Sequence, residues 1–236
     1  MGERYTRIFT LPQGRLYQTG APVLLLAGAL LKDTQTGRVL AQLKFQSIDN
    51  RSIKAMKVAL AAFDSFGSVL MGVDEFQYLD LNVGRNESFG SKTAIPMPSS
   101  DTRSFSCRCL NVVFTDGSTW TASGEAWLPL VDQSTLEQSL GNELADQFRR
   151  DTNQKAPYSL AHDRDLWYCV CGAVNHDGEA ACCACNAKRQ TLADAADPAL
   201  LRERLAEYQH QQANRPPGKR RNAPKGRQKP PSADEG

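Results

Sequence analysis

The sequence predicts a mainly β protein. It indicates an antiparallel β-sandwich over residues 15–130, followed by a helix, a small cysteine-rich ribbon, a second helix and a polar tail. Three observations support this fold class. Apolar and polar residues alternate in short runs through the first half of the chain, which is the pattern of half-buried strands. Turn residues separate these runs at spacings of roughly 8–15 residues, as in sandwiches. A helical period begins only near residue 132.

Seven strand candidates lie between residues 15 and 130, after an N-terminal arm over residues 1–14. Asp116-Gly117 joins the last two runs, and this dipeptide is the strongest short hairpin signal. Pro96 places another run at a sheet edge, because proline has no N–H to donate to a neighbouring strand. The seven runs cover residues 23–31, 39–45, 56–62, 76–83, 91–97, 105–115 and 118–121.

The turns around the third run resemble those of Ig-like domains of the FxLYD kind. An Asn lies in the first turn, an Ile-x-x-x-x-Val pattern follows, and an aromatic-Asp-x-x-Gly turn closes the run. The matching residues are Asn50, Ile53, Val58, Phe63, Asp64 and Gly67. The resemblance implies an Ig-like sandwich. Turns and core positions carry it, so it implies a fold and no activity.

Cys107 and Cys109 occupy alternate positions of one predicted strand, so their side chains share a face. Their Cα atoms should lie roughly 6.6 Å apart with parallel Cβ vectors, a geometry that resists a disulfide. We expect both to act as small buried apolar residues. The alternative, a second metal site, would need ligands from a neighbouring strand, and residues 15–130 contain no histidine.

Residues 131–150 are predicted to form an amphipathic helix. Ser134 and Glu137 have the spacing of a capping box at its start. An apolar stripe follows at intervals of four residues and needs a surface to pack on. We expect that surface to be the sandwich, with self-association as the alternative. The stripe consists of Leu136, Leu140, Leu144 and Phe148. A polar linker over residues 151–165 leads to the cysteine ribbon.

The ribbon over residues 166–189 contains two close sets of cysteines separated by a polar loop. Thiolate sulfur suits zinc, which takes about four ligands in a tetrahedron. Without a secretory signal, disulfides are the weaker interpretation. Cys183 with Cys185 is an alternative second pair, and His176 is expected to remain solvated. The predicted Zn²⁺ ligands are Cys169, Cys171, Cys182 and Cys185.

These residues resemble the zinc ribbon of the Ran-binding-protein type, with its pattern W-x-C…C-x-x-x-N-x6-C-x-x-C. The matching positions are Trp167, Cys169, Cys171, Asn175, Cys182 and Cys185. The resemblance implies a metal-stabilised fold in which Trp167 packs on the first cysteine turn and Asn175 bonds within it. Family members bind ubiquitin or single-stranded RNA. Gly172 and Ala173 stand where ubiquitin binders have Thr-Phe, and the acidic loop lacks the arginines of RNA binders. A sandwich followed by such a ribbon also resembles bacterial zinc-ribbon proteins of unassigned function.

A second helix is predicted over residues 197–212, because Asp197 can cap it and Pro198 suits its first turn. Residues 213–236 are polar and strongly basic, and we expect them to be disordered. They give the chain its net charge of +2, since the rest is mildly acidic. If the tail binds nucleic acid, phosphate contacts would come from Lys219, Arg220, Arg221, Lys225, Arg227 and Lys229.

The sequence favours a non-enzymatic, cytoplasmic zinc-binding adaptor whose partner is another protein. Its three histidines lie outside the sandwich, and no phosphate loop or nucleophile elbow is present. The alternative is a nucleic-acid-binding protein that uses the ribbon and the basic tail. An enzyme that employs Cys183 as a nucleophile is the least favoured class, since no base is placed beside it. No apolar run reaches the roughly 20 residues of a membrane helix, so we expect no membrane contact.

Overall fold

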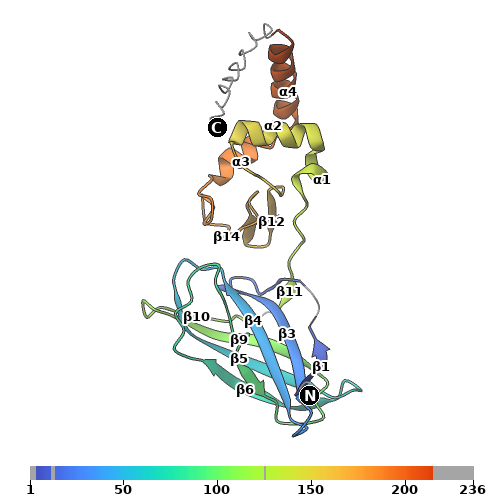
Figure 1. Cartoon of the computed structure of the whole chain (residues 1–236). Helices are drawn as coiled ribbons and strands as arrows, with labels where there is room; N and C mark the ends of the chain where they lie inside the picture. Colours follow the sequence, from blue (N-terminus) through green and yellow to red (C-terminus); the bar gives the residue numbers. More distant parts are fainter. Residues whose placement is uncertain (1–3, 12–13, 125, 215–236) are drawn as a thin grey trace, which may run out of the picture.

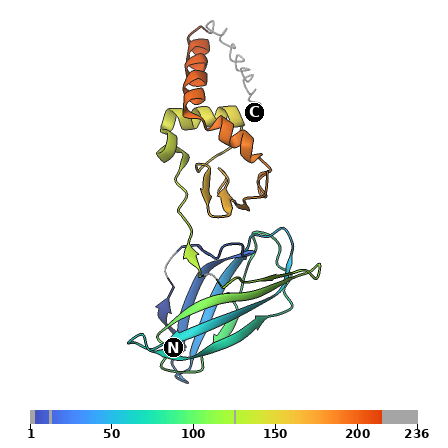
Figure 2. The same ribbon diagram turned by 180° about the vertical axis from the view of Figure 1, so that it is seen from behind.

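The computed structural model describes residues 4–11, 14–124 and 126–214. It confirms the mainly β fold, a β-sandwich followed by helices. The sandwich lies at one end, the helices lie at the other, and a small ribbon lies between them (Figure 1). The view from behind shows the same arrangement (Figure 2). Among the described helices, none combines the length and the apolar character that a bilayer-spanning segment requires.

The first sheet of the sandwich contains seven strands. Its centre is the antiparallel pair of β3 (Val23–Asp33) and β4 (Val39–Ser47). Strands β1 and β2 pair with opposite halves of β3, β7 and β8 pair with β4, and β11 extends the sheet beyond β2. These shorter strands are β1 (Tyr5–Thr10), β2 (Leu16–Tyr17), β7 (Ser88–Phe89), β8 (Ala94–Pro96) and β11 (Leu128–Pro129).

The second sheet contains four strands in the order β10-β9-β5-β6. They are β5 (Ile53–Phe63), β6 (Val69–Tyr78), β9 (Ser104–Phe114) and β10 (Thr119–Thr121). The hairpin predicted at Asp116-Gly117 joins β9 to β10, and Gly117 adopts a φ of 83° that favours glycine. The two sheets enclose one apolar core. It includes Val23, Leu43, Phe45, Val58, Leu60, Val112 and Phe114.

Two strand predictions for the sandwich were wrong in position. The expected N-terminal arm contains β1, which pairs with β3 from Tyr5↔Asp33 to Thr10↔Ala29. Most β1 side chains are exposed, so the strand lacks the clean alternation that reveals a buried face. The run expected over residues 76–83 begins earlier, because β6 starts at Val69. Two register shifts against β5 interrupt its period of two.

The region expected to form one helix over residues 131–150 forms two. Gly141, with a φ of 77°, separates α1 (Leu136–Leu140) from α2 (Asn142–Thr152). The capping box uses Thr135 and Gln138, one position later than the predicted pair, because Thr135 is the residue with extended backbone before the first turn. The second predicted helix is confirmed, since Asp197 caps α4 (Pro198–Ala213) and Pro198 begins it.

The ribbon is a three-stranded antiparallel sheet. Its strands are β12 (Ala161–Asp163), β13 (Leu166–Tyr168) and β14 (Val174–His176). β12 takes up part of the predicted linker, and a further helix, α3 (Arg189–Ala195), follows the last cysteine. The basic tail residues 215–236, including the six candidate phosphate contacts, lie outside the described residues.

Candidate metal centre

The first cysteine pair lies on the tight turn that leaves β13. The N–H of Gly172 donates to the carbonyl of Cys169 at 2.8 Å, and the N–H of Cys169 donates to Ala173 at 2.9 Å. Gly172 adopts a φ of 92°, a conformation that favours glycine because it has no Cβ. The turn leaves both Cys169 and Cys171 as thiols on one side.

The second pair lies on a turn that returns the chain toward the first. The N–H of Cys182 donates to Ala187, and the N–H of Asn186 donates back to the carbonyl of Cys182, both at 2.9 Å. Asn186 provides the left-handed residue here, with a φ of 58°. The N–H of Ala184 also points at the Cys182 sulfur at 3.4 Å. A backbone donor aimed at sulfur favours the thiolate that a metal would bind.

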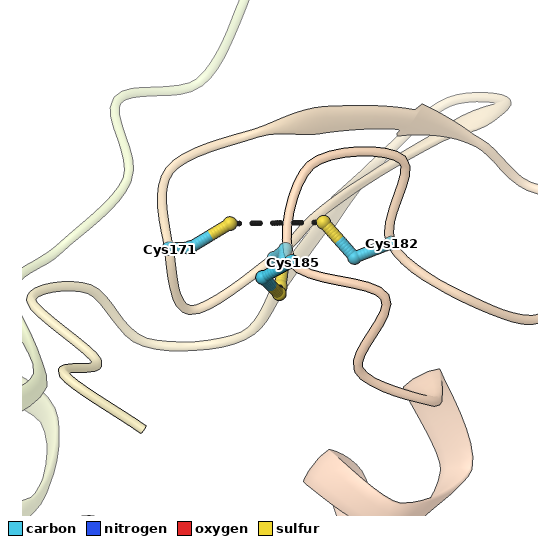
Figure 3. Close-up of side chains that lie close together, drawn as sticks. Cys171, Cys182 and Cys185 are labelled. Carbon is cyan, nitrogen blue, oxygen red and sulfur yellow. Dashed lines mark hydrogen bonds between the residues drawn. The ribbon is translucent and has the colours of Figure 1, made fainter.

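The two turns bring four sulfurs together, those of Cys169, Cys171, Cys182 and Cys185, all within 4.8 Å of one another. The Cys169 and Cys185 sulfurs lie 3.5 Å apart. Those of Cys171 and Cys182 lie 3.6 Å apart, and Figure 3 shows this pair with Cys185 beside it. A disulfide would need about 2.05 Å. Four thiolates around zinc, with bonds of about 2.3 Å, would place their sulfurs about 3.8 Å apart. The spacing therefore fits a tetrahedral metal ion.

The four thiols differ in their electrostatic surroundings. Burial raises the pKa of Cys171 to about 11. Burial also acts to raise the pKa of Cys182, but backbone N–H donors from Cys185 and Ala184, with the neighbouring thiols, lower it to about 7. Burial dominates at Cys169 and raises its pKa. The Cys182 thiol therefore ionises more readily than those of Cys169 and Cys171. A bound divalent cation would stabilise the thiolate form of its ligands.

Trp167 and Asn175 support the cysteine turns from β13 and β14. Both side chains are completely buried. The indole N–H of Trp167 donates to the carbonyl of Glu179 at 3.0 Å, and the Asn175 carbonyl oxygen accepts from the N–H of Cys183 at 2.9 Å. Trp167 is thus anchored to the loop between the cysteine pairs, and its ring is not exposed for stacking on a base. Both residues have the structural role that the sequence predicted.

The helices cover the cysteine cluster on the side away from the sandwich. Leu136 and Phe148 of the predicted stripe are buried, and Leu140 and Leu144 are partly buried. They pack with the ribbon, not on the sandwich as expected, because the cysteine turns offer an apolar surface there. The shared cluster includes Trp167, Cys169, Val170, Cys182, Leu192 and Leu201. Metal ligands and helices therefore form one small core.

The loop between the cysteine pairs also contacts the sandwich. The Glu179 carboxylate accepts from Arg85 Nη2 at 2.7 Å and from Asn50 Nδ2 at 2.8 Å. It also accepts from the backbone N–H of His176 at 2.9 Å. Burial acts to raise the pKa of Glu179, but the Arg85 guanidinium outweighs it and lowers that pKa. Glu179 is therefore a charged link between the ribbon and two sandwich turns.

A second contact joins the start of the ribbon to β2. Tyr17 Oη donates to the Asp165 carboxylate at 2.7 Å, and Arg164 Nη1 donates to the Tyr17 carbonyl at 3.0 Å. Burial raises the pKa of Tyr17, so its hydroxyl remains a donor. Apolar side chains from both parts surround this contact. They are Tyr17, Ala21, Leu24, Ile48, Leu130, Leu166, Tyr168 and Val174.

The remaining cysteines lie outside the cluster. Asn86 Nδ2 lies 3.8 Å from the sulfur of Cys183. Burial raises the pKa of the Cys183 thiol. Cys182, not Cys183, therefore belongs to the four-sulfur cluster. Cys107 and Cys109 are buried in β9, as predicted, and burial raises the pKa of Cys109 to about 12. His176 is absent from the cluster, as expected.

The sequence did not reveal the residues that join the ribbon to the sandwich. Arg85 follows no recognisable motif, and its partner Glu179 is 94 positions away. Tyr17 and Asp165 are 148 positions apart. A charged residue in a turn was the only signal that the sequence offered for this contact, and a charge alone does not identify its partner.

The fold and the site define a class, a β-sandwich protein with a C-terminal four-cysteine cluster at metal-binding distance. Comparison with protein-family models, curated proteins and solved structures finds no match to this chain. The resemblances to the Ran-binding-protein-type ribbon and to FxLYD-like domains therefore stay predictions based on the residues that carry them.

Proposed function

We propose that this protein is a non-enzymatic adaptor that binds other proteins and holds a structural zinc ion. The observation that carries the proposal is the four-sulfur cluster of Cys169, Cys171, Cys182 and Cys185. Soft thiolate ligands select zinc or iron–sulfur chemistry over calcium or magnesium. Four protein sulfurs complete a tetrahedral zinc shell and leave no open position for a substrate, which is typical of a structural site.

A bound zinc ion would supply folding energy to the C-terminal part of the chain. In zinc-finger peptides this amounts to about 10–16 kcal/mol. The chain's own residues do the rest. Trp167 and Asn175 fix the turns, Leu136 and Phe148 shield the sulfurs from water, and Glu179 holds the loop against the sandwich. The helices α1–α4 would thereby be held in a fixed position relative to the sandwich.

Exposed apolar side chains support an interaction role for the sandwich. Phe66 at the tip of the β5–β6 hairpin is 95% exposed, and Val69 and Met71 on β6 are each 76% exposed. Grouped apolar side chains of this kind mark contact sites for other proteins more often than single ones do. An adaptor would present this surface while the metal-stabilised ribbon and helices offer a second one.

Elemental analysis of the purified full chain tests the metal. The native protein and the Cys183→Ser variant should each hold one zinc ion per chain, whereas Cys169→Ser and Cys182→Ser should lose it. Cys183→Ser is the matched control, because it removes a neighbouring sulfur that lies outside the cluster. Equal zinc content in all four proteins, or an absence of metal from the native protein, would refute the structural zinc site.

Affinity capture with the full chain tests the adaptor role. The Phe66→Ser/Met71→Ser double variant should retain its zinc and lose a partner that the native chain captures. If the double variant captured the partner as well as the native chain does, this exposed apolar surface would no longer support the adaptor role.

Nucleic-acid binding is the second candidate, and the basic composition of residues 215–236 favours it. The complete burial of Trp167 leaves the tail as its main support. The full chain should then bind single-stranded RNA more strongly at low than at moderate salt, and a chain ending at Ala213 should not. Equal, weak binding by both would exclude this candidate.

A further inference from the structure

The two outer strands of the four-stranded sheet differ in how they are protected. β6 forms one edge, and two register shifts against β5 interrupt it. Gly72 lies at one of these irregularities, and Asp74 and Glu75 place charge on the same strand. Bulges and charged side chains are the usual means by which an edge strand resists pairing with another chain. The β6 edge is therefore poorly suited to accept a further strand.

The opposite edge is only partly covered. β10 pairs with β9 from Asn111 to Val113, and the N–H of Ala122 donates to Leu110. The earlier half of β9 pairs with β5 from Ser104↔Phe63 to Cys109↔Val58 without a register shift. Within the described residues, no second strand pairs with that half. Every second residue of such a strand directs its N–H and C=O away from the sheet.

A groove lies along this uncovered half of β9. Its volume is about 440 Å³, within the range of roughly 300–1,000 Å³ found for ligand sites. Apolar side chains from both sheets line it, including Leu11, Leu16, Leu25, Phe105 and Trp127. Figure 2 shows β9 as the green strand that crosses the face of the sandwich. The groove therefore places an apolar surface beside unpaired main-chain groups.

One charged residue contributes to the described lining of the groove. Arg108 lies on β9, and its side chain is exposed. Ser106, two positions earlier on the same face, is also exposed and lines the groove. A partner that occupied the groove would gain from an acidic side chain opposite Arg108, because complementary charge fixes the register of a complex.

We propose that Ser104–Cys109 on β9 is the site where an extended peptide segment of a partner protein adds as a further strand of the sheet. Its main chain pairs with β9, one apolar side chain enters the groove, and an acidic side chain faces Arg108. Main-chain hydrogen bonds give such complexes their affinity, and side-chain pockets give them their specificity. The inference deepens the proposed adaptor function and rests on it, because it names the partner chemistry.

A peptide fits these features better than a small apolar molecule does. Lipid-like ligands could fill the groove, but they have no regular series of donors and acceptors for the uncovered edge of β9. An extended peptide supplies both the apolar side chain and the main-chain groups, which repeat at the strand spacing of about 3.3 Å per residue. A small molecule and a second copy of the chain are the outcomes that the test must separate.

The test begins with a displayed library of random nine-residue peptides selected against the zinc-loaded full chain. The strongest binder is then synthesised with and without N-methyl groups on the amides of one edge. We expect enriched sequences that alternate apolar and polar residues and contain an acidic residue. N-methylation of the pairing edge should abolish binding, and N-methylation of the other edge should not.

Charge reversal identifies the site. Arg108→Glu should weaken the selected peptide by about tenfold, as expected for one interfacial charge pair, and a peptide with Lys in place of its acidic residue should recover that loss. Lys54→Glu on β5, also exposed, is the matched control and should change the affinity little. Amide exchange of Phe105 and Cys107, whose side chains face the core and whose N–H groups face the open edge of β9, should slow when the peptide is bound.

Three results would overturn the proposal. The first is a library that yields no enriched peptide, or peptides insensitive to both N-methylation and Arg108→Glu. The second is displacement of every selected peptide by a long-chain fatty acid that itself binds in the groove without slowing amide exchange of Phe105 and Cys107. The third is a dimer of the full chain that dissociates in the Arg108→Glu variant, with no selected peptide able to compete with it for β9. None of them changes the zinc content or the capture that depends on Phe66, so the proposed function is tested separately.

Discussion

The guanidinium of Arg85 on the sandwich binds the carboxylate of Glu179 in the loop between the two cysteine pairs. Arg85 Nη2 lies 2.7 Å from Glu179 Oε2. The side chains are only 10% and 20% exposed, respectively. Arg85 Nη1 also donates to the side-chain oxygen of Asn50, which itself bonds Glu179. This pair connects the conformation of the cysteine loop directly to two turns of the sandwich.

Replacement of Glu179 by Gln should weaken the link between the two parts. The variant leaves Arg85 charged and largely buried without its counterion, at a cost of about 1–3 kcal/mol. Glu75→Gln is the matched control, because the Lys57–Glu75 pair is 42% and 45% exposed and solvent screens such surface pairs, so they contribute little to stability. Chemical denaturation of both zinc-loaded variants measures the difference. Equal losses of stability would show that Arg85–Glu179 is no stronger than a surface pair.

Zinc removal should loosen the C-terminal part first. If the proposed zinc is bound, a chelator would remove the ion that stabilises the small core around Trp167, so amides of β13 and β14 should lose protection from hydrogen exchange. The contact with Tyr17 should weaken too, since its acceptor Asp165 lies only four residues before Cys169. The strands β5 and β9 have their own apolar core and should stay protected. Simultaneous loss of amide protection in the ribbon sheet and in β5 and β9 of the sandwich would contradict this separation.

Gly72→Ala should destabilise the sandwich. A Cβ at Gly72 would lie 2.2 Å from the backbone oxygen of Leu60, which cannot move without disturbing β5. Overpacking of this kind costs about 1–3 kcal/mol. Gly178→Ala is the control, because a Cβ there meets open space and surface substitutions change stability by about 0.5 kcal/mol at most. Denaturation midpoints measure both effects. Native-like stability of Gly72→Ala would mean that the irregular part of β6 is able to shift.

Part of the acid sensitivity of the sandwich should come from Asp33. Its carboxylate accepts from the Gln35 N–H at 2.9 Å and lies 3.1 Å from Arg4 Nη2. The backbone bond from Gln35 and the pairing with Arg4 outweigh burial and lower the pKa below its usual value of 3.8. A pKa that is lower in the folded state contributes stability above the unfolded pKa, and this contribution is lost as the pH falls through the folded pKa.

Asp33→Asn should therefore make the unfolding free energy fall less steeply as the pH decreases below about 4. Measurements in the presence of a chelator exclude the competition between protons and zinc for the thiols. Parallel pH profiles for the native and variant proteins would show that Asp33 contributes no acid sensitivity.

Local patterns predicted those features that depend on neighbouring residues. The alternation over residues 39–45 identified β4, and Asp116-Gly117 identified the β9–β10 hairpin. Asp197 and Pro198 marked the start of α4, since capping and a fixed proline φ act within one turn. Paired spacings likewise identified the cysteines, because each turn brings its own two sulfurs to one side.

Features that depend on tertiary contacts could not be read in the same way. Gly141 splits a helix whose apolar stripe continues across the break. α3 is too short for a periodic signal, and it forms where Leu192 is buried against the ribbon. The surface that the stripe covers is made of cysteine turns, which do not resemble an apolar strand or helix in the sequence. Arg85 and Glu179 meet only after the ribbon has docked on the sandwich.

The bond between Tyr17 and Asp165 spans 148 positions, and this separation affects how the protein is made. A ribosome translates most of the chain before the acceptor of the Tyr17 hydroxyl leaves the exit tunnel. Until then, Leu24 and Ile48 have no ribbon to cover them. The nascent sandwich therefore passes through a stage with an uncovered apolar patch, which chaperones recognise and which makes an interrupted translation product prone to aggregate.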